Sequence, residues 1–371
     1  MKKSLLALAV LGAIAGVAQA QQSNVTIYGS IDAGVRHNNN GLNGTSAGSN
    51  LWSMASGTSN SNRLGFRGTE DLGGGMNAHF NLESGFSSKA GTLALANTLF
   101  DRTASVGLGG PWGSLDLGLQ YSLAFWTIFN YDPFSFRYPT IIPTATAAAG
   151  TQVNAAVTSP FGGSRMVNDV QYTGQFGPVK VGAEYALGEV AGNTRGNSAQ
   201  AVSASWSSAG FTVGSAYTRR NPNLAAAGAA ANFQNNRQWT IGAAYAAAPF
   251  RVAVGYIDER QDGITGDSRV RNAWVGGSYN FTPALSLTAA YYETKLTPSA
   301  TAESKRRLFI VGGAYSLSKR TNLYADIDYT RFNGTFRDSI YGATPTGVAF
   351  SQPGGVTSSQ TAFTVGVNHL F

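Results

Sequence analysis

Apolar and polar residues alternate with a period of two along most of this chain. In residues 25–35, Val25 and Ile27 fall on one face, and Thr26 and Tyr28 fall on the other. The same alternation returns in three further stretches, residues 76–83, 179–185 and 323–330. A half-buried strand has this period, whereas an amphipathic helix repeats about every 3.6 residues. The pattern predicts a chain built from β-strands.

Sixteen such segments can be marked, an even number. They cover residues 25–36, 60–70, 75–86, 102–109, 114–121, 165–175, 178–188, 199–208, 211–219, 236–248, 250–260, 270–281, 284–296, 305–317, 321–332 and 361–371. Short turns follow the even-numbered segments, whereas mostly longer, polar links follow the odd-numbered ones. The long links are residues 37–59, 87–101, 122–164, 189–198, 220–235, 261–269, 297–304 and 333–360. Short turns at one rim and long loops at the other are typical of bacterial outer-membrane barrels.

The last segment, FTVGVNHLF, alternates up to Phe371. We expect it to pair with residues 25–35, because this closes the cylinder and leaves no open sheet edge. A sandwich or a fibrous sheet would leave the regular rhythm of short and long links unexplained. The expected fold class is therefore all-β: a 16-stranded antiparallel transmembrane β-barrel with short periplasmic turns and long external loops.

Composition supports an exported membrane barrel. Residues 1–20 have a basic start, an apolar stretch and a small-residue end, which is the pattern of a cleavable secretory signal. Residues 21–371 would then form the barrel. No later apolar run reaches the length of about 18 residues that a spanning helix needs. Charged residues are only 12% of the chain, and cysteine is absent, so neither disulfides nor thiolate metal sites are expected.

Nothing in the sequence points to catalysis. The three histidines lie on separate segments, and we find no HExxH, GxSxG or glycine-rich phosphate motif. His79 and Glu83 share a predicted lumen face, but they lie about 13 Å apart along a strand. We therefore expect no enzyme activity, no metal, no cofactor and no nucleic-acid partner.

The third long link, residues 122–164, is the strongest functional signal. A loop of this length in a compact domain is usually functional or disordered. Its first half, SLAFWTIFNYDPFSFRYPTIIP, is too aromatic for a solvated tail. We expect this segment, called loop 3 below, to fold into the lumen and narrow an otherwise open channel. The alternative is an external flap or a partner-binding loop.

Charge in the lumen follows from strand phase. Arg63 and Arg67 alternate with Leu64 and Phe66, which places both arginines inside the barrel. Arg165 falls in the same phase as the polar residues of its own strand. These side chains are expected at the pore constriction.

Loop 3 adds Arg137 and a single acid, Asp132, to that constriction. Fixed positive charge in a narrow passage with low-dielectric walls attracts anions and repels cations. The channel should therefore favour anions. Alternatively, Asp32, Glu83 or Asp116 neutralises the arginines within the wall.

The chain resembles the betaproteobacterial general porins, within the Gram-negative porin family. The resemblance rests on VTIYGSIDAGV at 25–35, NRLGFRGTEDLGGG at 62–75, LESGF at 82–86, YSLSKRTNLY at 315–324 and VGVNHLF at 365–371. It implies a homotrimeric sixteen-stranded barrel in the outer membrane, loop 3 in the pore, and passive diffusion of ions and small hydrophilic solutes.

The resemblance to anion-selective members also implies an arginine cluster at Arg63, Arg102 and Arg165. Arg102 shares strand phase with Val106 and Leu108, so only a bulge at the start of its strand would turn it inward. Part of the basic lining is expected to be missing, because Leu119, Asn368 and Leu370 stand where many relatives have basic residues. Loop 3 likewise has YDPFSF at 131–136 in place of the family's Pro-Glu-Phe-Gly.

The expected partners are two further copies of the chain, outer-membrane lipid, small solutes and anions, and the barrel assembly machinery, for which Phe371 looks like the recognition signal. Two other functions stay open. One is a substrate-specific channel whose loop 3 aromatics bind one class of solute; these are Phe125, Trp126, Phe129, Phe134 and Phe136. The other is an adhesin or receptor that acts through loops 37–59 and 333–360.

Overall fold

The computed structural model describes residues 24–43, 46–138, 164–223, 230–263, 266–297, 303–333 and 358–371, so the expected signal segment lies outside the described residues. These residues form seventeen strands and one helix. The elements are β1 (Asn24–Asn43), β2 (Ser46–Ser56), β3 (Arg63–Gly73), β4 (Met76–Gly85), β5 (Thr103–Gly110), β6 (Gly113–Tyr121), α2 (Leu123–Phe129), β7 (Arg165–Phe176), β8 (Val179–Ala186), β9 (Ala199–Ser208), β10 (Phe211–Arg220), β11 (Asn236–Ala247), β12 (Phe250–Gln261), β13 (Ser268–Asn280), β14 (Leu285–Thr297), β15 (Ser304–Ser316), β16 (Thr321–Asn333) and β17 (Ser359–Leu370).

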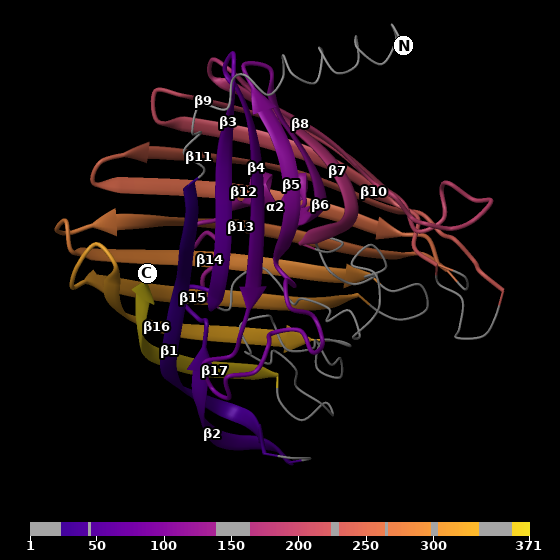
Figure 1. Ribbon diagram of the computed structural model, residues 1–371. Helices are drawn as coiled ribbons and strands as arrows, with labels where there is room; N and C mark the ends of the chain where they lie inside the picture. Colours follow the sequence, from indigo (N-terminus) through magenta and orange to yellow (C-terminus); the bar gives the residue numbers. More distant parts are fainter. Residues whose placement is uncertain are drawn as a thin grey trace, which may run out of the picture.

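The strands close into an antiparallel barrel (Figure 1). From β3 to β17, each strand pairs with the next one in the chain. Both β3 and β17 also pair with β1, which completes a ring of sixteen strands. Ser30 lies opposite Leu370, and the backbone of Phe371 exchanges hydrogen bonds with Gly29 at 3.1 and 3.2 Å. The predicted fold and its closure by the last strand are confirmed.

One predicted loop contains a strand instead. Residues 37–59 were expected as a polar link, but β1 continues to Asn43 and returns as β2 along its own second half. β2 and β3 follow each other along β1, because Ser56 lies opposite Ala33 and Arg63 lies opposite Ser30. β2 and β3 thus occupy the same place in the wall beside β1, and the residues between them interrupt this strand. The hairpin is rich in Ser, Gly and Asn, and only its end alternates, where Trp52 and Met54 are exposed and Ala55 is buried. This stretch is too short to predict a strand by its period.

Strand phase separates an outer apolar face from a polar interior. Val25 is 62% exposed on the outside, whereas Asp32 on the opposite face has no exposed surface. The main cluster of buried hydrophobic residues joins loop 3 to strands β11–β16, so the core of the molecule lies inside the barrel. No helix in the described part of the chain is long and apolar enough to cross a membrane.

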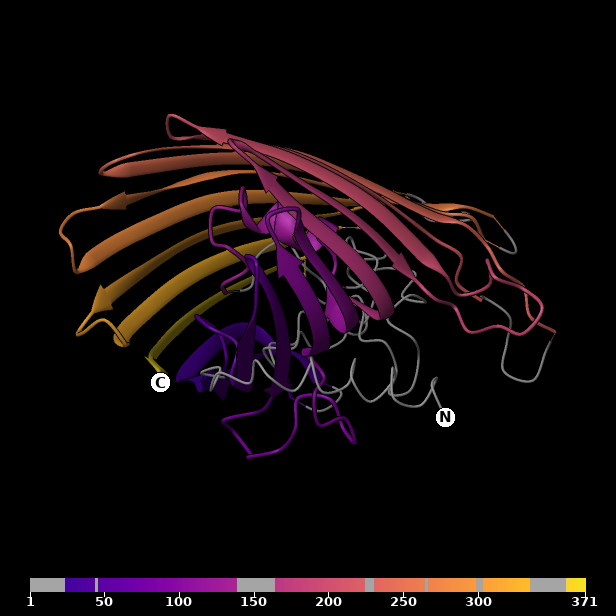
Figure 2. The ribbon, with the colours of Figure 1, turned by 45° about the horizontal axis from the view of Figure 1, so that its top comes forward.

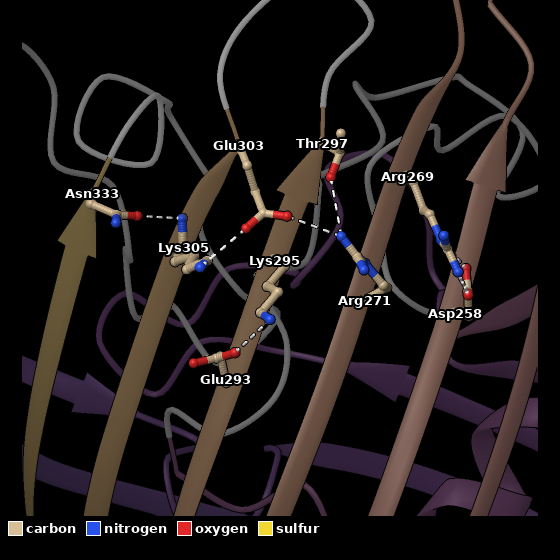
Figure 3. A network of polar contacts seen from close by, with 9 residues as sticks. All are labelled: Asp258, Arg269, Arg271, Glu293, Lys295, Thr297, Glu303, Lys305 and Asn333. Carbon is tan, nitrogen blue, oxygen red and sulfur yellow. Dashed lines mark hydrogen bonds and ion pairs between the residues drawn. The ribbon is translucent and has the colours of Figure 1, made fainter.

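Near the long-loop ends of β12–β16, charged side chains form ion pairs both within a strand and between strands (Figure 3). Glu303 bonds both Arg271 at 3.0 Å and Lys305 at 3.2 Å, and Lys295 meets Glu293 at 3.3 Å. Exposed ion pairs of this kind contribute little to stability. Their position shows where the wall changes from an apolar to a charged surface, as expected where a barrel leaves the hydrocarbon layer.

Candidate functional site

Loop 3 begins with a helix that is fixed at its first turn. The Ser122 hydroxyl accepts a hydrogen bond from the backbone N–H of Phe125 at 3.3 Å and caps α2. The backbone N–H of Leu123 donates to a Glu184 side-chain oxygen at 3.1 Å, which gives a partner to one of the free N–H groups in the first turn. The helix packs inside the barrel against β8–β11, with Leu123 and Ile128 buried (Figure 2).

The segment after α2 continues across the opposite part of the wall. The Tyr131 hydroxyl and the Thr240 hydroxyl lie 2.6 Å apart, and the Trp274 indole N–H donates to the Tyr131 carbonyl at 3.1 Å. At its far end, the backbone N–H of Tyr138 donates to the Thr58 carbonyl at 2.7 Å. Loop 3 therefore folds into the lumen over residues 122–138, as predicted. The remainder up to residue 163 lies outside the described residues.

Inward-facing glycines make room for the loop on the wall. A β-carbon on Gly242 would overlap the ring of Tyr131, and one on Gly276 would press on Pro133 at 2.7 Å. These close approaches require the absence of a side chain. The wall is thus shaped for loop 3, which explains why an aromatic segment can lie flat against the strands.

Asp132 anchors the loop and does not line the passage. Its side chain has no exposed surface, and its carboxylate accepts hydrogen bonds from the backbone N–H of Phe136 and the hydroxyl of Tyr292, both at 2.7 Å. Burial raises the pKa of this carboxyl to about 6. The sequence predicted Asp132 at the constriction, but a fully buried carboxylate cannot face a solute.

The exposed face of α2 presents aromatic rings to the lumen. Trp126 is 43% exposed and Phe129 is 37% exposed, with ring centroids 5.9 Å apart. Phe125 lies between them and Phe136, whose ring centroid is 4.7 Å away. The Tyr121 ring, at the end of β6, stacks on Phe125 at 4.4 Å. We call the region beside this aromatic face the constriction.

Two arginines that are distant in sequence meet at Tyr121. The Arg165 guanidinium lies over the Tyr121 ring at 4.6 Å and donates to its hydroxyl at 3.0 Å. The Arg102 guanidinium lies 5.8 Å from the same ring. Both arginines were predicted at the constriction, and the structure brings them together beside loop 3.

Glu83 joins Arg102 to a third predicted residue. Its carboxylate accepts a hydrogen bond from Arg102 Nε at 2.5 Å and lies 3.5 Å from Arg63 Nε. One acid thus faces two guanidinium groups, so the positive charge is only partly neutralised. Of the other two acids considered, Asp32 binds backbone N–H groups and Asp116 binds His79.

Arg67 and Arg137 are exposed, and neither makes an ion pair with another described residue. The Arg67 guanidinium lies over the Tyr28 ring at 5.1 Å, on the inner face of the wall. Arg137 lies on loop 3, where its backbone N–H donates to the Phe134 carbonyl at 3.1 Å. Arg63, Arg102 and Arg165 are thus linked beside loop 3 through Glu83 and Tyr121, although Arg102 is only 7% exposed. Among the described residues, no contact places Arg67 or Arg137 beside the aromatic face.

His79 takes part in a polar cluster that does not have catalytic geometry. Its Nε2 atom lies 2.7 Å from Asp116 and 3.3 Å from the Ser114 hydroxyl. In a serine–histidine–acid triad, the acid binds the ring nitrogen opposite to the one that faces the serine. Here both groups share one nitrogen, which agrees with the expected absence of catalysis.

Strand alternation alone missed Tyr121 and was ambiguous for Arg102. Tyr121 has the phase of Leu115 and Leu117, which are exposed on the outer face. The register against β7 shifts between Gly118 and Gln120, and Gly118 has a φ of 129°. Such a bulge changes the direction of the following side chains, so that Tyr121 faces the lumen. In the sequence, Gly118 near the end of the strand was the one signal of this bulge.

A closed barrel with an inward loop and a charged, partly aromatic passage defines the class as an outer-membrane channel. The chain belongs to the Gram-negative porin family, whose family model matches residues 7–335. It is an outer-membrane porin and not an enzyme.

Individual relatives agree with this assignment. An outer membrane porin protein of Bordetella pertussis is 29% identical over 423 aligned positions, covering 100% of both chains. The anion-selective porin from Comamonas acidovorans has a similar structure, with a TM-score of 0.77, 23% identity, and coverage of 94% of this chain and 100% of that one. The trimer form of OmpT from Vibrio cholerae gives a TM-score of 0.67 at 14% identity, covering 94% of this chain and 99% of that one.

Proposed function

We propose that this porin is an anion-selective channel for the passive diffusion of small hydrophilic solutes and ions. The observation that carries the proposal is the excess of arginine over acid near loop 3. Arg63 and Arg102 share Glu83, and Arg165 lies over Tyr121 with no ion pair to a described residue. Arg67 and Arg137 add exposed positive charge on the inner wall and on loop 3. The anion-selective porin from Comamonas acidovorans, which has a similar fold, is consistent with it.

The mechanism is electrostatic partition. Loop 3 occupies lumen space and brings low-dielectric aromatic side chains close to the arginines. Where the passage narrows between such surfaces, fixed positive charge raises the local anion concentration and lowers that of cations. Diffusion through such a passage is coupled to no energy source, so each solute moves only down its own electrochemical gradient.

The test is the reversal potential of the purified porin in a planar bilayer under a KCl gradient. We expect the sign of an anion-selective pore in the wild type and a loss of selectivity in Arg63→Ala/Arg165→Ala. The control is Arg271→Ala/Lys305→Ala, because these two basic residues lie at the outer rim (Figure 3). Cation selectivity in the wild type, or an unchanged potential in the double variant, would contradict the proposal.

We also propose that the porin is a homotrimer. The link between β4 and β5 carries three exposed leucines, with Leu99 61% exposed. Exposed apolar surface of this kind is typical of a contact with another protein chain. A similar fold occurs in the trimer form of OmpT.

Leu99→Asp should convert trimers to monomers in analytical ultracentrifugation in detergent, whereas Leu187→Asp, in another long link, should not. Trimers that persist in Leu99→Asp would remove this loop from the interface.

A further inference from the structure

The constriction has an aromatic surface that the diffusion of small hydrophilic solutes does not require. Trp126 and Phe129 expose 43% and 37% of their surface although they lie on α2, whose first turn is held by Ser122 and Glu184. Exposed apolar surface is unfavourable in water and gains from contact with another flat apolar group. Aromatic rings also prefer offset-stacked or edge-to-face partners. This surface is therefore suited to a solute that carries an aromatic ring.

A positive group lies next to this surface. The Trp126 ring centroid is 5.4 Å from that of Tyr121, and the Arg165 guanidinium lies 4.6 Å from the same Tyr121 ring. Arg165 has no acidic partner among the described residues, and its Nε atom has no hydrogen-bond partner there. Glu83 is occupied by Arg102 and does not neutralise Arg165.

We propose that the constriction contains a binding site for aromatic carboxylates. The ring of the solute stacks on Trp126 and meets Phe129 edge-to-face, because these two rings lie at 72° to each other. Its carboxylate meets the Arg165 guanidinium, whose planar fork matches two carboxylate oxygens. A neutral aromatic solute lacks the ionic contact, and an aliphatic carboxylate lacks the ring contact. The inference rests on the proposed anion channel and assigns it a preferred class of solute.

The test is the block of single-channel KCl current by benzoate, compared with acetate and benzyl alcohol at the same concentrations. In the wild type, benzoate should reduce the current saturably, and neither comparison compound should match it. Trp126→Ala and Arg165→Gln should each raise the half-blocking concentration by about tenfold, the effect of losing one stacked ring or one charge-assisted contact.

Trp239→Ala is the matched control, because Trp239 is similarly exposed, at 41%, but lies on the outer face of β11. It should leave the benzoate block unchanged. If Trp126→Ala does not assemble, Phe129→Leu removes an aromatic ring at similar volume and should weaken the block in the same direction. Equal effects of benzoate and acetate on the wild type would overturn the site. So would a half-blocking concentration that equals the wild-type value in Trp126→Ala or, if that variant does not assemble, in Phe129→Leu.

The reversal potential measured without benzoate distinguishes a failure of the aromatic-carboxylate site from a failure of the proposed anion channel. An anion-selective pore that ignores benzoate refutes the site and leaves the channel proposal intact. A pore that is not anion-selective refutes the channel proposal, and with it the reason for an aromatic anion to enter.

Discussion

Two buried aspartates fix the path of the chain through hydrogen bonds to its backbone. The Asp32 carboxylate accepts from the backbone N–H groups of Thr58, Ser59 and Asn60 at 2.9 to 3.1 Å, at the break between β2 and β3. Asp132 plays the equivalent part inside loop 3. Buried N–H groups need partners, so each carboxylate makes an irregular segment stable where a strand ladder is absent.

Asp32→Ala should destabilise the barrel. The change leaves the three N–H groups and the Tyr324 hydroxyl, which donates to Asp32 at 2.8 Å, without their acceptor. A buried donor left unsatisfied costs about 1–3 kcal/mol, so the free energy of unfolding should fall by more than about 2 kcal/mol. Urea unfolding in detergent or lipid, followed by gel mobility, measures this. Asp71→Ala, at an exposed turn, is the control, and equal stability of the two variants would contradict the assigned role.

Asp132 should make stability depend on pH. Burial raises the pKa of its carboxyl from an ordinary value of 3.8 to about 6, so the native state binds this proton more tightly than the unfolded state does. Stability should therefore increase as the pH falls from about 6 to about 4, and level off below that. The measurement is the unfolding temperature of the wild type minus that of Asp132→Asn, across this range. A difference that does not change with pH would show that Asp132 does not titrate in the fold.

At the scale of elements, the sequence predicted strands wherever one face meets lipid. All sixteen wall positions were found, because the hydrocarbon layer enforces alternation. β2 was missed, since its first half is polar and contains glycine, and the alternation is limited to the few residues around Trp52 and Met54. The helix α2 was missed for a different reason: its seven residues are too few for a helical period, and loop 3 was recognised only by its length and aromatic content.

The candidate site was predictable only where strand phase applies. Arg63 and Arg67 follow from alternation. By contrast, the meeting of Arg102 and Arg165 at Tyr121 depends on a bulge and on the position of loop 3, which are tertiary features. The burial of Asp132 also depends on Tyr292, 160 positions further along the chain.

The fit between loop 3 and its glycine-lined wall can be tested by filling one glycine. Gly242→Ala places a methyl group where the Tyr131 ring lies, and overpacking of this kind costs about 1–3 kcal/mol of unfolding free energy. Gly313→Ala is the control, because a β-carbon there meets nothing closer than 3.6 Å. Combining Gly242→Ala with Tyr131→Ala should cost less than the sum of the two single changes. Strict additivity of the two costs would indicate that the ring and the glycine do not compete for space.

At the scale of the whole molecule, the barrel reverses the layout of a soluble domain. Its apolar outer face meets lipid, and its buried cluster lies in the lumen between loop 3 and β11–β16. The ring must close before either surface is complete, because an open edge would leave the backbone groups of β1 and β17 unpaired in lipid. Closure depends on the last strand, which ends beside Gly29.

Phe371 can therefore act in two ways, as a closing contact and as the proposed recognition signal for the assembly machinery. Its backbone bonds Gly29, and a β-carbon on Gly29 would overlap its ring. Deleting Phe371 should lower the amount of folded barrel in the outer membrane, whereas Phe281→Ala, an exposed aromatic at a short turn, should not. Unchanged levels after the deletion would remove both roles.

Refolding the purified deletion variant in detergent separates the two roles of Phe371. If only its level in cells falls while its unfolding temperature matches the wild type, the residue acts as a signal. A lower unfolding temperature in detergent as well would assign the loss to the missing contacts with Gly29, because no assembly machinery is present in that experiment.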